Sequence, residues 1–366
     1  MNKRIILYFC GLLVCCTSIA QTQSNDPNWQ LKWEDQFNTF NTNRWEKAKY
    51  VIHGDNPPEP QLYLENQVWT ANGNLIIEIN NMKDTCPTPA PTAISGACGS
   101  CESGTKYNYK SGWIETTGAY DIHYGYIEAR IKFPYKKVNG KSWGFWPAFW
   151  TFVGYHTNSN PAEIDIFEVS CARHPVNEFT TNVHTCYNSD DDPTCDEKQY
   201  SGVHAFQNFQ FNDWHTYAIE WNRNRIIWYL DGKAFRTLNN HNVIDPVRLI
   251  LNMGVDRKNL LSTFPPFQEY MFVDYVKVYC LKCDKNTVVN EISNFNTYHY
   301  TVKKSITLSN ATTIPAGSNI SLRANDFIEL KPGFEVQTGK ELYLDVSPCE
   351  TCVPIAQQAQ KGNDEE

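Results

Sequence analysis

The sequence has no excess of basic residues. Lys and Arg together number 32 against 40 Asp and Glu, so the formal net charge is −8. Proteins that bind nucleic acid or anionic membranes usually carry basic patches, because phosphates attract Lys and Arg. We therefore expect no nucleic-acid partner. The same balance gives no long-range attraction toward a polyanionic substrate.

Long apolar runs are also scarce. The one candidate, Ile5 to Cys16, follows two basic residues and is too short to span a bilayer. Small residues at positions 18 and 20 complete the pattern of a secretory signal peptide over residues 1–20. We therefore expect a secreted protein without a membrane span. Adjacent Cys15 and Cys16 leave an outer-membrane lipoprotein as the alternative.

No segment shows the sustained 3.6-residue periodicity of an amphipathic helix. Instead, short runs of β-branched and aromatic residues alternate with turn signals such as Asn72-Gly73 and Asp231-Gly232. Aromatic residues make up 14% of the chain and charged residues only 20%, which suits an all-β protein with an aromatic ligand surface. These features predict an all-β fold, a β-sandwich.

The composition changes after Cys283. Beyond it, short apolar runs alternate with Pro-Ala-Gly and Lys-Pro-Gly turns at a spacing of roughly 8 to 12 residues, which indicates short strands. We predict a second, small β-module whose strands stack as in a solenoid. The expected order is signal peptide 1–20, linker 21–28, main domain 29–283, linker 284–298, β-module 299–352 and disordered tail 353–366.

Three of the 13 cysteines lie in the signal peptide, which leaves an even number, ten. In an exported protein this indicates disulfides. Three pairs have C-x-x-C spacing, for which zinc is the alternative: Cys98/Cys101, Cys280/Cys283 and Cys349/Cys352. Connectivity does not follow from sequence, and we expect local bridges that pin loops.

Three carboxylates stand out in a stretch of Ile, Phe and Val that predicts a strand. Glu163 and Asp165 share one face because side chains alternate along a strand. Strict alternation would place Phe167 there too, so a β-bulge at Ile166-Phe167 is needed to return Glu168 to that face. The bulged path is about four strand steps, roughly 13 Å between Cα atoms. Leaning side chains could bring the carboxyl groups to about 5 Å, the spacing of retaining glycosidases.

These acids are the minimum set for cleaving a glycosidic bond by double displacement. Glu163 and Glu168 fit the nucleophile and the acid/base, and Asp165 can hydrogen-bond the nucleophile and help separate their pKa values. A strand with three solvated acids and a Ca²⁺ site are the alternatives.

The strand before the acids favours catalysis. Trp143, Trp146 and Trp150 are placed to stack on sugar rings, although some of them must belong to the core. Alternation puts Trp146, Ala148 and Trp150 on one face. Ala148 beside the acids would leave room for a ring.

Glu163-Ile-Asp-Ile-Phe-Glu168 matches the E-x-D-x-x-E signature of glycoside hydrolase family 16, in the bulged form of laminarinase-like and agarase-like members. The resemblance covers about residues 27–280 and implies a β-jelly-roll sandwich with a substrate cleft on its concave face. Blocks similar to the family's follow in the same order at residues 29–37, 72–75, 124–132, 146–150, 214–221, 229–232 and 273–279.

The resemblance implies roles for individual residues. It makes Glu163 the nucleophile, Asp165 its helper and Glu168 the acid/base, with no cofactor for catalysis. Substrate contacts are expected from Trp146, Glu128, Arg130, Trp150, His184 and Trp143, with a surface ion pair as the alternative for Glu128 and Arg130 and a structural role for His184. Many members bind a structural Ca²⁺, for which the matching positions are the Gly73 carbonyl and Asp274.

The substrate is less well determined. Laminarinase-like members carry a Trp shortly before the first catalytic Glu, but Asn158 to Glu163 has none. We expect a monomeric, secreted, retaining endo-β-glycanase that acts on a polysaccharide, with β-1,3-glucan first by family frequency. The alternatives are a β-galactanase on agar, porphyran or carrageenan, a transglycosylase, and a non-catalytic carbohydrate-binding protein.

The C-terminal module also has a resemblance. The stretch from Ala324 to Val336 is similar to part of a small β-domain that is appended to many secreted enzymes of gliding or marine polysaccharide-degrading bacteria. The resemblance does not imply one role for it.

Overall fold

The structure is a computed structural model. It describes residues 29–54, 59–93, 98–135, 137–138, 141–142, 144–153, 162–171, 173–185, 198–223, 225–241, 243–256, 266–281, 286–289, 303–308, 313–314, 319–336, 338 and 341–346. The predicted signal peptide, the first linker and the tail lie outside these residues. No helix in the described part of the chain is long and apolar enough to cross a membrane.

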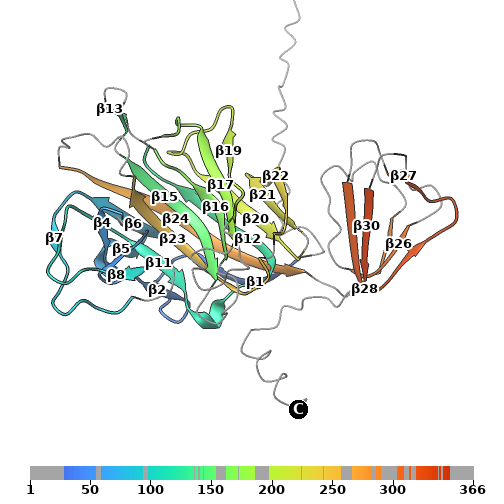
Figure 1. Cartoon of the computed structure of the whole chain (residues 1–366), viewed down its shortest axis with the longest axis horizontal. Coiled ribbons are helices and arrows are strands. Elements are labelled where there is room, and N and C mark those ends of the chain that lie inside the picture. The colour runs from blue at the N-terminus through green and yellow to red at the C-terminus, as the bar shows by residue number, and fades with distance from the viewer. Residues whose placement is uncertain are drawn as a thin grey trace, which may run out of the picture.

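Two β-sheets form the main domain (Figure 1). The larger sheet contains, in spatial order, β22(Lys233–Asn239), β21(Arg225–Leu230), β20(His215–Trp221), β12(Gly125–Lys132), β24(Gln268–Leu281), β6(Asn74–Asn80), β10(Tyr109–Ser111), β4(Gln61–Tyr63), β3(Val51–Ile52) and β8(Gly99–Ser100). In addition, β1(Trp29–Asp35) pairs with β24, and β5(Val68–Ala71) pairs with β6.

The smaller sheet carries the acidic strand. Its order is β18(Lys198–Gln199), β17(Glu178–Thr185), β16(Ala162–Glu168), β15(Phe145–Val153), β23(Val247–Val255), β11(Trp113–Thr116) and β2(Trp45–Lys47), and β19(Gly202–Ala205) pairs with β17. Short elements complete the domain: β7(Asp84–Thr85) with β9(Lys106–Tyr107), β13(Lys137–Val138) with β14(Lys141–Ser142), and the 3₁₀ turns η2(Glu65–Gln67) and η3(Gly118–Tyr120).

The two sheets pack face to face through one apolar core. Alternate residues of β12, such as Ile127 and Ile131, meet alternate residues of β15 and β23, such as Phe149 and Leu251, and all four are inaccessible to solvent. This period-2 burial is what a sandwich requires. The predicted all-β sandwich is therefore confirmed.

Both predicted hairpins are present. Asn72-Gly73 joins β5 to β6 and Asp231-Gly232 joins β21 to β22, and all four residues have positive φ angles between 49° and 73°. Two consecutive positive φ values define the type I′ turn, whose twist matches that of the flanking strands.

A disulfide joins Cys86 to Cys101 across a sequence separation of 15. The bridge holds β8 beside β3, where the Cys101 amide donates to the Tyr50 carbonyl at 3.2 Å. It is a local bridge of the expected kind, and it removes the Cys101 thiolate that the zinc alternative needs. Cys280 is disulfide-bonded as well.

We expect replacement of both Cys86 and Cys101 by Ser to lower the free energy of unfolding by about 3 kcal/mol, the chain-entropy value for a loop of this length. Urea denaturation of the double variant and the wild type without reductant measures the difference. The matched control is the same comparison in reductant, where the bridge of Cys280 is open in both proteins and their midpoints should become equal. Equal midpoints for variant and wild type without reductant would show that the bridge does not stabilise the fold.

The C-terminal module is built from parallel strands. Its main sheet has the order β25(Asn286–Val289), β26(Lys303–Leu308), β28(Asn319–Leu330) and β30(Glu341–Val346), while β27(Thr313–Ile314) pairs with β29(Glu335–Val336). A small core of Ile306, Leu308, Leu322 and Ala324 lies beneath it. This sequential parallel pairing agrees with a solenoid-like stack.

One predicted boundary is wrong. Residues 286–289 were expected in the linker but form β25, which pairs with β26. Three of the four residues, Thr287, Val288 and Val289, are β-branched and favour a strand, and only the polar residues around them indicated a linker.

Candidate active site

Strand β16 contains the predicted bulge. On one side Phe167 pairs with Phe149 and Asp165 with Trp150, which leaves Ile166 as the extra residue. On the other side the register shifts between Asp165 and Glu168. Ile166 and Phe167 both enter the core, and Glu168 returns to the face that carries Glu163 and Asp165.

The larger sheet anchors this bulge through the core. Trp228 on β21 donates its indole N–H to the Asp165 carbonyl at 2.9 Å, so a backbone acceptor beside the bulge has a buried partner. Phe167 packs against Tyr217 at a ring distance of 4.2 Å and stacks on Phe133 at 5.6 Å. The extra residue is therefore held by packing and a hydrogen bond.

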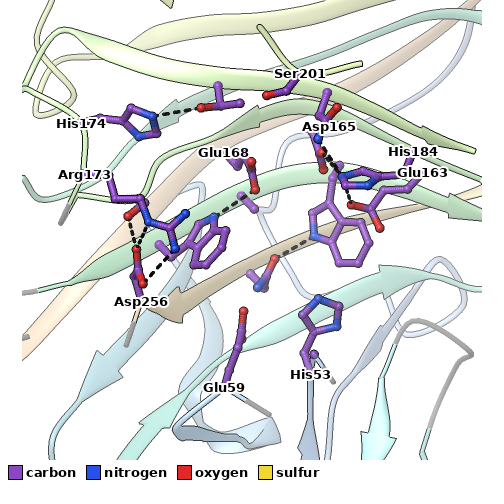
Figure 2. A pocket seen from close by; sticks show the side chains of 18 of the residues that line it. His53, Glu59, Glu163, Asp165, Glu168, Arg173, His174, His184, Ser201 and Asp256 are labelled. Atoms are coloured by element: carbon purple, nitrogen blue, oxygen red, sulfur yellow. Dashed lines mark hydrogen bonds and ion pairs between the residues drawn. The ribbon is translucent and has the colours of Figure 1, made fainter. Parts of the chain in front are cut away.

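A cavity of about 730 Å³ opens over the face of the smaller sheet that points away from the core. Its volume is in the range that holds a drug-sized ligand. Residues from β15, β16, β17 and β23 form its floor, and segments from outside the sheet form its sides, as Figure 2 shows. Its acidic and basic lining residues are His53, Glu59, Glu163, Asp165, Glu168, Arg173, His174, His184 and Asp256.

Glu163, Asp165 and His184 form one cluster in this cavity (Figure 2). His184 Nε2 lies 3.4 Å from Asp165 Oδ2 and 3.6 Å from Glu163 Oε1. Asn182 Nδ2 contacts the same ring nitrogen at 2.8 Å, which fixes the imidazole beside both carboxyl groups. The imidazole ring of His184 therefore lies within polar contact of both the Glu163 and the Asp165 carboxyl groups.

Burial raises the pKa of Glu163 well above its ordinary value, and the charges of Asp165 and Glu168 raise it further. The protonated form of Glu163 also donates a hydrogen bond to the Asp165 carboxylate, which raises the pKa of Glu163 further. Glu163 therefore holds a proton that it shares with the Asp165 carboxyl group.

Glu168 lies on the same face, and the Trp146 indole N–H donates to its Oε2 at 3.1 Å. Burial and the charge of Asp165 raise the pKa of Glu168 to about 8, although the Trp146 hydrogen bond and the Arg173 charge act in the opposite direction. At neutral pH this carboxyl group carries a proton that it can give to a leaving oxygen.

The aromatic strand is oriented as alternation predicts. Trp146, Ala148 and Trp150 of β15 all line the cavity. Trp150 is nearly buried and donates to Asn252 Oδ1 at 2.8 Å, whereas Trp146 is partly exposed and offers a ring face. Of the two, Trp146 is the better stacking platform. Trp143 lies outside the described residues.

The structure corrects the expectation for Glu128 and Arg130. Both belong to β12 of the larger sheet, on the face opposite the core residues Ile127 and Ala129, and neither lines the cavity. Glu128 is buried against the Tyr126 hydroxyl at 3.3 Å. Arg130 forms an ion pair, but its partner is Asp274 and not Glu128.

That ion pair also bears on calcium. Arg130 Nη1 lies 2.6 Å from Asp274 Oδ2, so a guanidinium already neutralises the proposed acidic ligand. Calcium takes about six to eight oxygen ligands and depends on carboxylate charge. Gly73 lies in the β5–β6 turn and offers only its carbonyl. These residues as placed do not fit a calcium site.

Glu163, Asp165 and His184 are the one acid–imidazole group, within the ranges that the structure describes, whose ligand atoms lie within 4.8 Å of one another. Such spacing can suit a metal ion. The hydrogen bond between Glu163 and Asp165 instead indicates a shared proton at this cluster.

Several lining residues carry no signal in the sequence. Arg173 pairs with buried Asp256 at 2.8 Å and lies over the Trp146 ring at 5.5 Å. Neither the residue type nor the spacing of Arg173 and Asp256 in the sequence indicates that they line a cavity. Asn182 is the exception, since it precedes His184 by two residues in a strand and must share its face.

Residues 61–251 match the family model of glycosyl hydrolases family 16. The glucan endo-1,3-beta-glucosidase A1 of Niallia circulans is 27% identical over 293 residues, which cover 68% of this chain and 37% of the relative. The beta-glucanase of Bacillus subtilis is 24% identical over 283 residues, covering 76% of this chain and 98% of the relative.

Solved structures agree on the fold. The endo-beta-1,3-glucanase of Pyrococcus furiosus has a TM-score of 0.52 and 25% identity, and the match covers 69% of this chain and 95% of that one. The chain spans about a third of the length of the first curated relatives it matches. The family match contains the acidic strand β16 and extends over just over half of the sequence, and the chain belongs to glycosyl hydrolases family 16.

Proposed function

We propose that this protein is a retaining endo-β-glycanase that hydrolyses a β-1,3-linked glucan by double displacement. One observation carries the proposal. Glu163, Asp165 and Glu168 face a single cavity from one bulged strand, with a shared proton at Glu163 and a raised pKa at Glu168. The family match and the glucanase names of the relatives support the substrate class.

In the first step Glu163 attacks the anomeric carbon, and its shared proton moves fully to Asp165. Glu168 gives its proton to the glycosidic oxygen, so the C–O bond breaks and a glycosyl ester of Glu163 forms. In the second step Glu168, now a carboxylate, takes a proton from water. The water oxygen attacks C1 and releases Glu163, which leaves the anomeric configuration unchanged.

We expect the first-formed product to be the β anomer. Proton NMR of the anomeric signals during the first minutes of hydrolysis checks this, because mutarotation mixes the anomers later. An α anomer appearing first would mean that water attacks directly and that Glu163 is not a nucleophile.

A substrate panel tests the linkage. It contains laminarin, lichenan, agarose, porphyran and carrageenan, with released reducing ends as the measurement. Laminarin is the expected best substrate, and faster release from a galactan would replace the glucan proposal by a galactanase.

We further propose that the enzyme is exported and monomeric. The signal-peptide pattern of residues 1–20 and the Cys86–Cys101 disulfide support export, because such bridges persist in oxidising compartments. The size of the purified mature chain on gel filtration tests the oligomeric state.

A further inference from the structure

Glu59 faces the catalytic acids from the opposite side of the cavity. It precedes β4, and Figure 2 shows its side chain pointing toward the cavity across from Glu168. Its backbone amide donates to the His53 carbonyl at 2.8 Å, and the His53 ring packs on Trp150 at 5.4 Å. Glu59 is therefore anchored beside the proposed sugar-binding surface, and its link to the mechanism described above is its charge, which adds to the raised pKa of Glu168.

A directed chain of hydrogen bonds fixes its carboxylate. Trp150 Nε1 can only donate, and it bonds Asn252 Oδ1 at 2.8 Å, so Asn252 Nδ2 donates onward to the Tyr63 hydroxyl at 2.9 Å. Tyr63 then donates to Glu59 Oε2 at 2.8 Å. Burial raises the pKa of Tyr63 well above its ordinary value, so the phenol keeps the proton it donates.

The second carboxylate oxygen is left for a ligand. Oε2 accepts from Tyr63 and from Gln61 Nε2, whereas no group in the described part of the chain donates to Oε1. A carboxylate accepts hydrogen bonds and offers none. Oε1 is therefore suited to a hydroxyl donor, the most abundant polar group of a neutral sugar.

Gly254 on β23 leaves the space that Glu59 occupies. A Cβ at this position would lie 3.1 Å from Glu59 Oε2 and 3.3 Å from both Oε1 and the Tyr63 hydroxyl. The carboxylate thus lies almost on the backbone of the cavity floor.

The charge of the cavity also favours a neutral sugar as the ligand. Five carboxyl groups line it, and its one guanidinium, Arg173, is held by Asp256 at 2.8 and 3.2 Å. Burial lowers the pKa of His174, which keeps that ring neutral. A sulfate or uronate group would meet the Glu59 carboxylate and the negative charge that Glu163 and Asp165 share, whereas the Arg173 guanidinium is already paired with Asp256, and such repulsion discriminates strongly against a ligand.

We propose that Glu59 is a specificity-determining residue, which accepts a hydrogen bond from a sugar hydroxyl through Oε1 and excludes sulfated or carboxylated sugars from the cleft. The substrate class is accordingly an uncharged β-glycan. This inference rests on the proposed glycanase function and narrows its substrate. It separates neutral glucans from the sulfated galactans that the sequence left open.

The test compares kcat/KM on the neutral glycan that the wild type hydrolyses fastest with kcat/KM on the same glycan after chemical sulfation. For Glu59→Gln we expect about a ten- to hundred-fold loss on the neutral glycan, the worth of a hydrogen bond to a charged group. The ratio of kcat/KM on the neutral glycan to kcat/KM on the sulfated glycan should fall at the same time. A purely structural role would lower both activities equally.

Gly254→Ala displaces the Glu59 carboxylate without changing its chemistry. We expect this variant to show the same fall in the ratio of kcat/KM on the neutral glycan to kcat/KM on the sulfated glycan. Glu65→Gln, on the exposed turn η2, is the matched control with unchanged kinetics. Unaltered kcat/KM and preference in both cleft variants would overturn the inference, as would a wild type that prefers a sulfated galactan. Either result leaves glycoside hydrolysis in place, whereas a wild type inactive on the whole panel overturns the proposed function and this inference with it.

Discussion

Replacement of Glu163 by Ala is expected to lower kcat on the polysaccharide by about 10⁴- to 10⁶-fold, the scale seen when a nucleophile is removed. The two acids next to it on the described strand are not expected to replace it, because Asp165 is held in the cluster with His184 and Glu168 is the proposed acid. Reducing-end release under substrate saturation measures the loss.

The same variant should not be less stable than the wild type. Glu163 is confined with two other acids, and its raised pKa means that folding disfavours its charge. Removing it relieves repulsion, so the thermal midpoint should stay equal or rise. Glu65→Ala on η2 is the control for loss of a carboxylate at an exposed site. Substantial turnover by folded Glu163→Ala would refute the assignment of the nucleophile.

Replacement of Glu168 by Gln is expected to give the second-largest effect, a loss of about 10²- to 10⁴-fold on polysaccharide, the contribution typical of general acid catalysis. An amide cannot give a proton to the leaving oxygen. A dinitrophenyl glycoside needs no such proton, so the glycosyl-enzyme should still form, and azide should release it as the β-glycosyl azide. Failure of azide to increase turnover would assign the acid/base role elsewhere.

The pH profile tests the same residue. The pKa of Glu168 is raised to about 8, so the protonated acid is present below that pH and is lost as the pH rises through it. Wild-type kcat/KM on polysaccharide should accordingly fall on the alkaline side near pH 8. In Glu168→Gln with the dinitrophenyl glycoside this alkaline fall should disappear, while the thermal midpoint reports on folding across the same range.

The bulge was predictable because two requirements conflict in one short stretch. Glu168 had to share a face with Glu163, whereas Phe167 occupied the position that strict alternation assigns to that face. One extra residue resolves the conflict, and the register of β16 against both neighbours shows it. The same alternation correctly placed Trp146 and Trp150 on the cavity side.

Position within the sheets was not predictable. Alternation shows that Glu128 and Arg130 share a face, but it does not tell which of two sheets carries their strand, and the structure places them in the larger one. Glu59 gave no signal at all, because it lies outside any periodic segment about one hundred residues before the acids. Cysteine pairing did not follow closeness in the sequence, because Cys101 bonds Cys86 rather than Cys98, which is three residues away.

In a regular strand, the residues that face the cleft determine by alternation which residues fill the core, and the bulge in β16 removes this link. Because Ile166 is surplus to the ladder, shortening the strand by one residue there would restore plain alternation and still present three acids to the cleft. What would disappear is one large side chain of the core, together with the register that brings the Asp165 carbonyl to the Trp228 indole. The acids that face the cleft and the side chains that fill the core can thus change independently. A one-residue difference in strand length alters the core side chains and keeps the three acids on the cleft face.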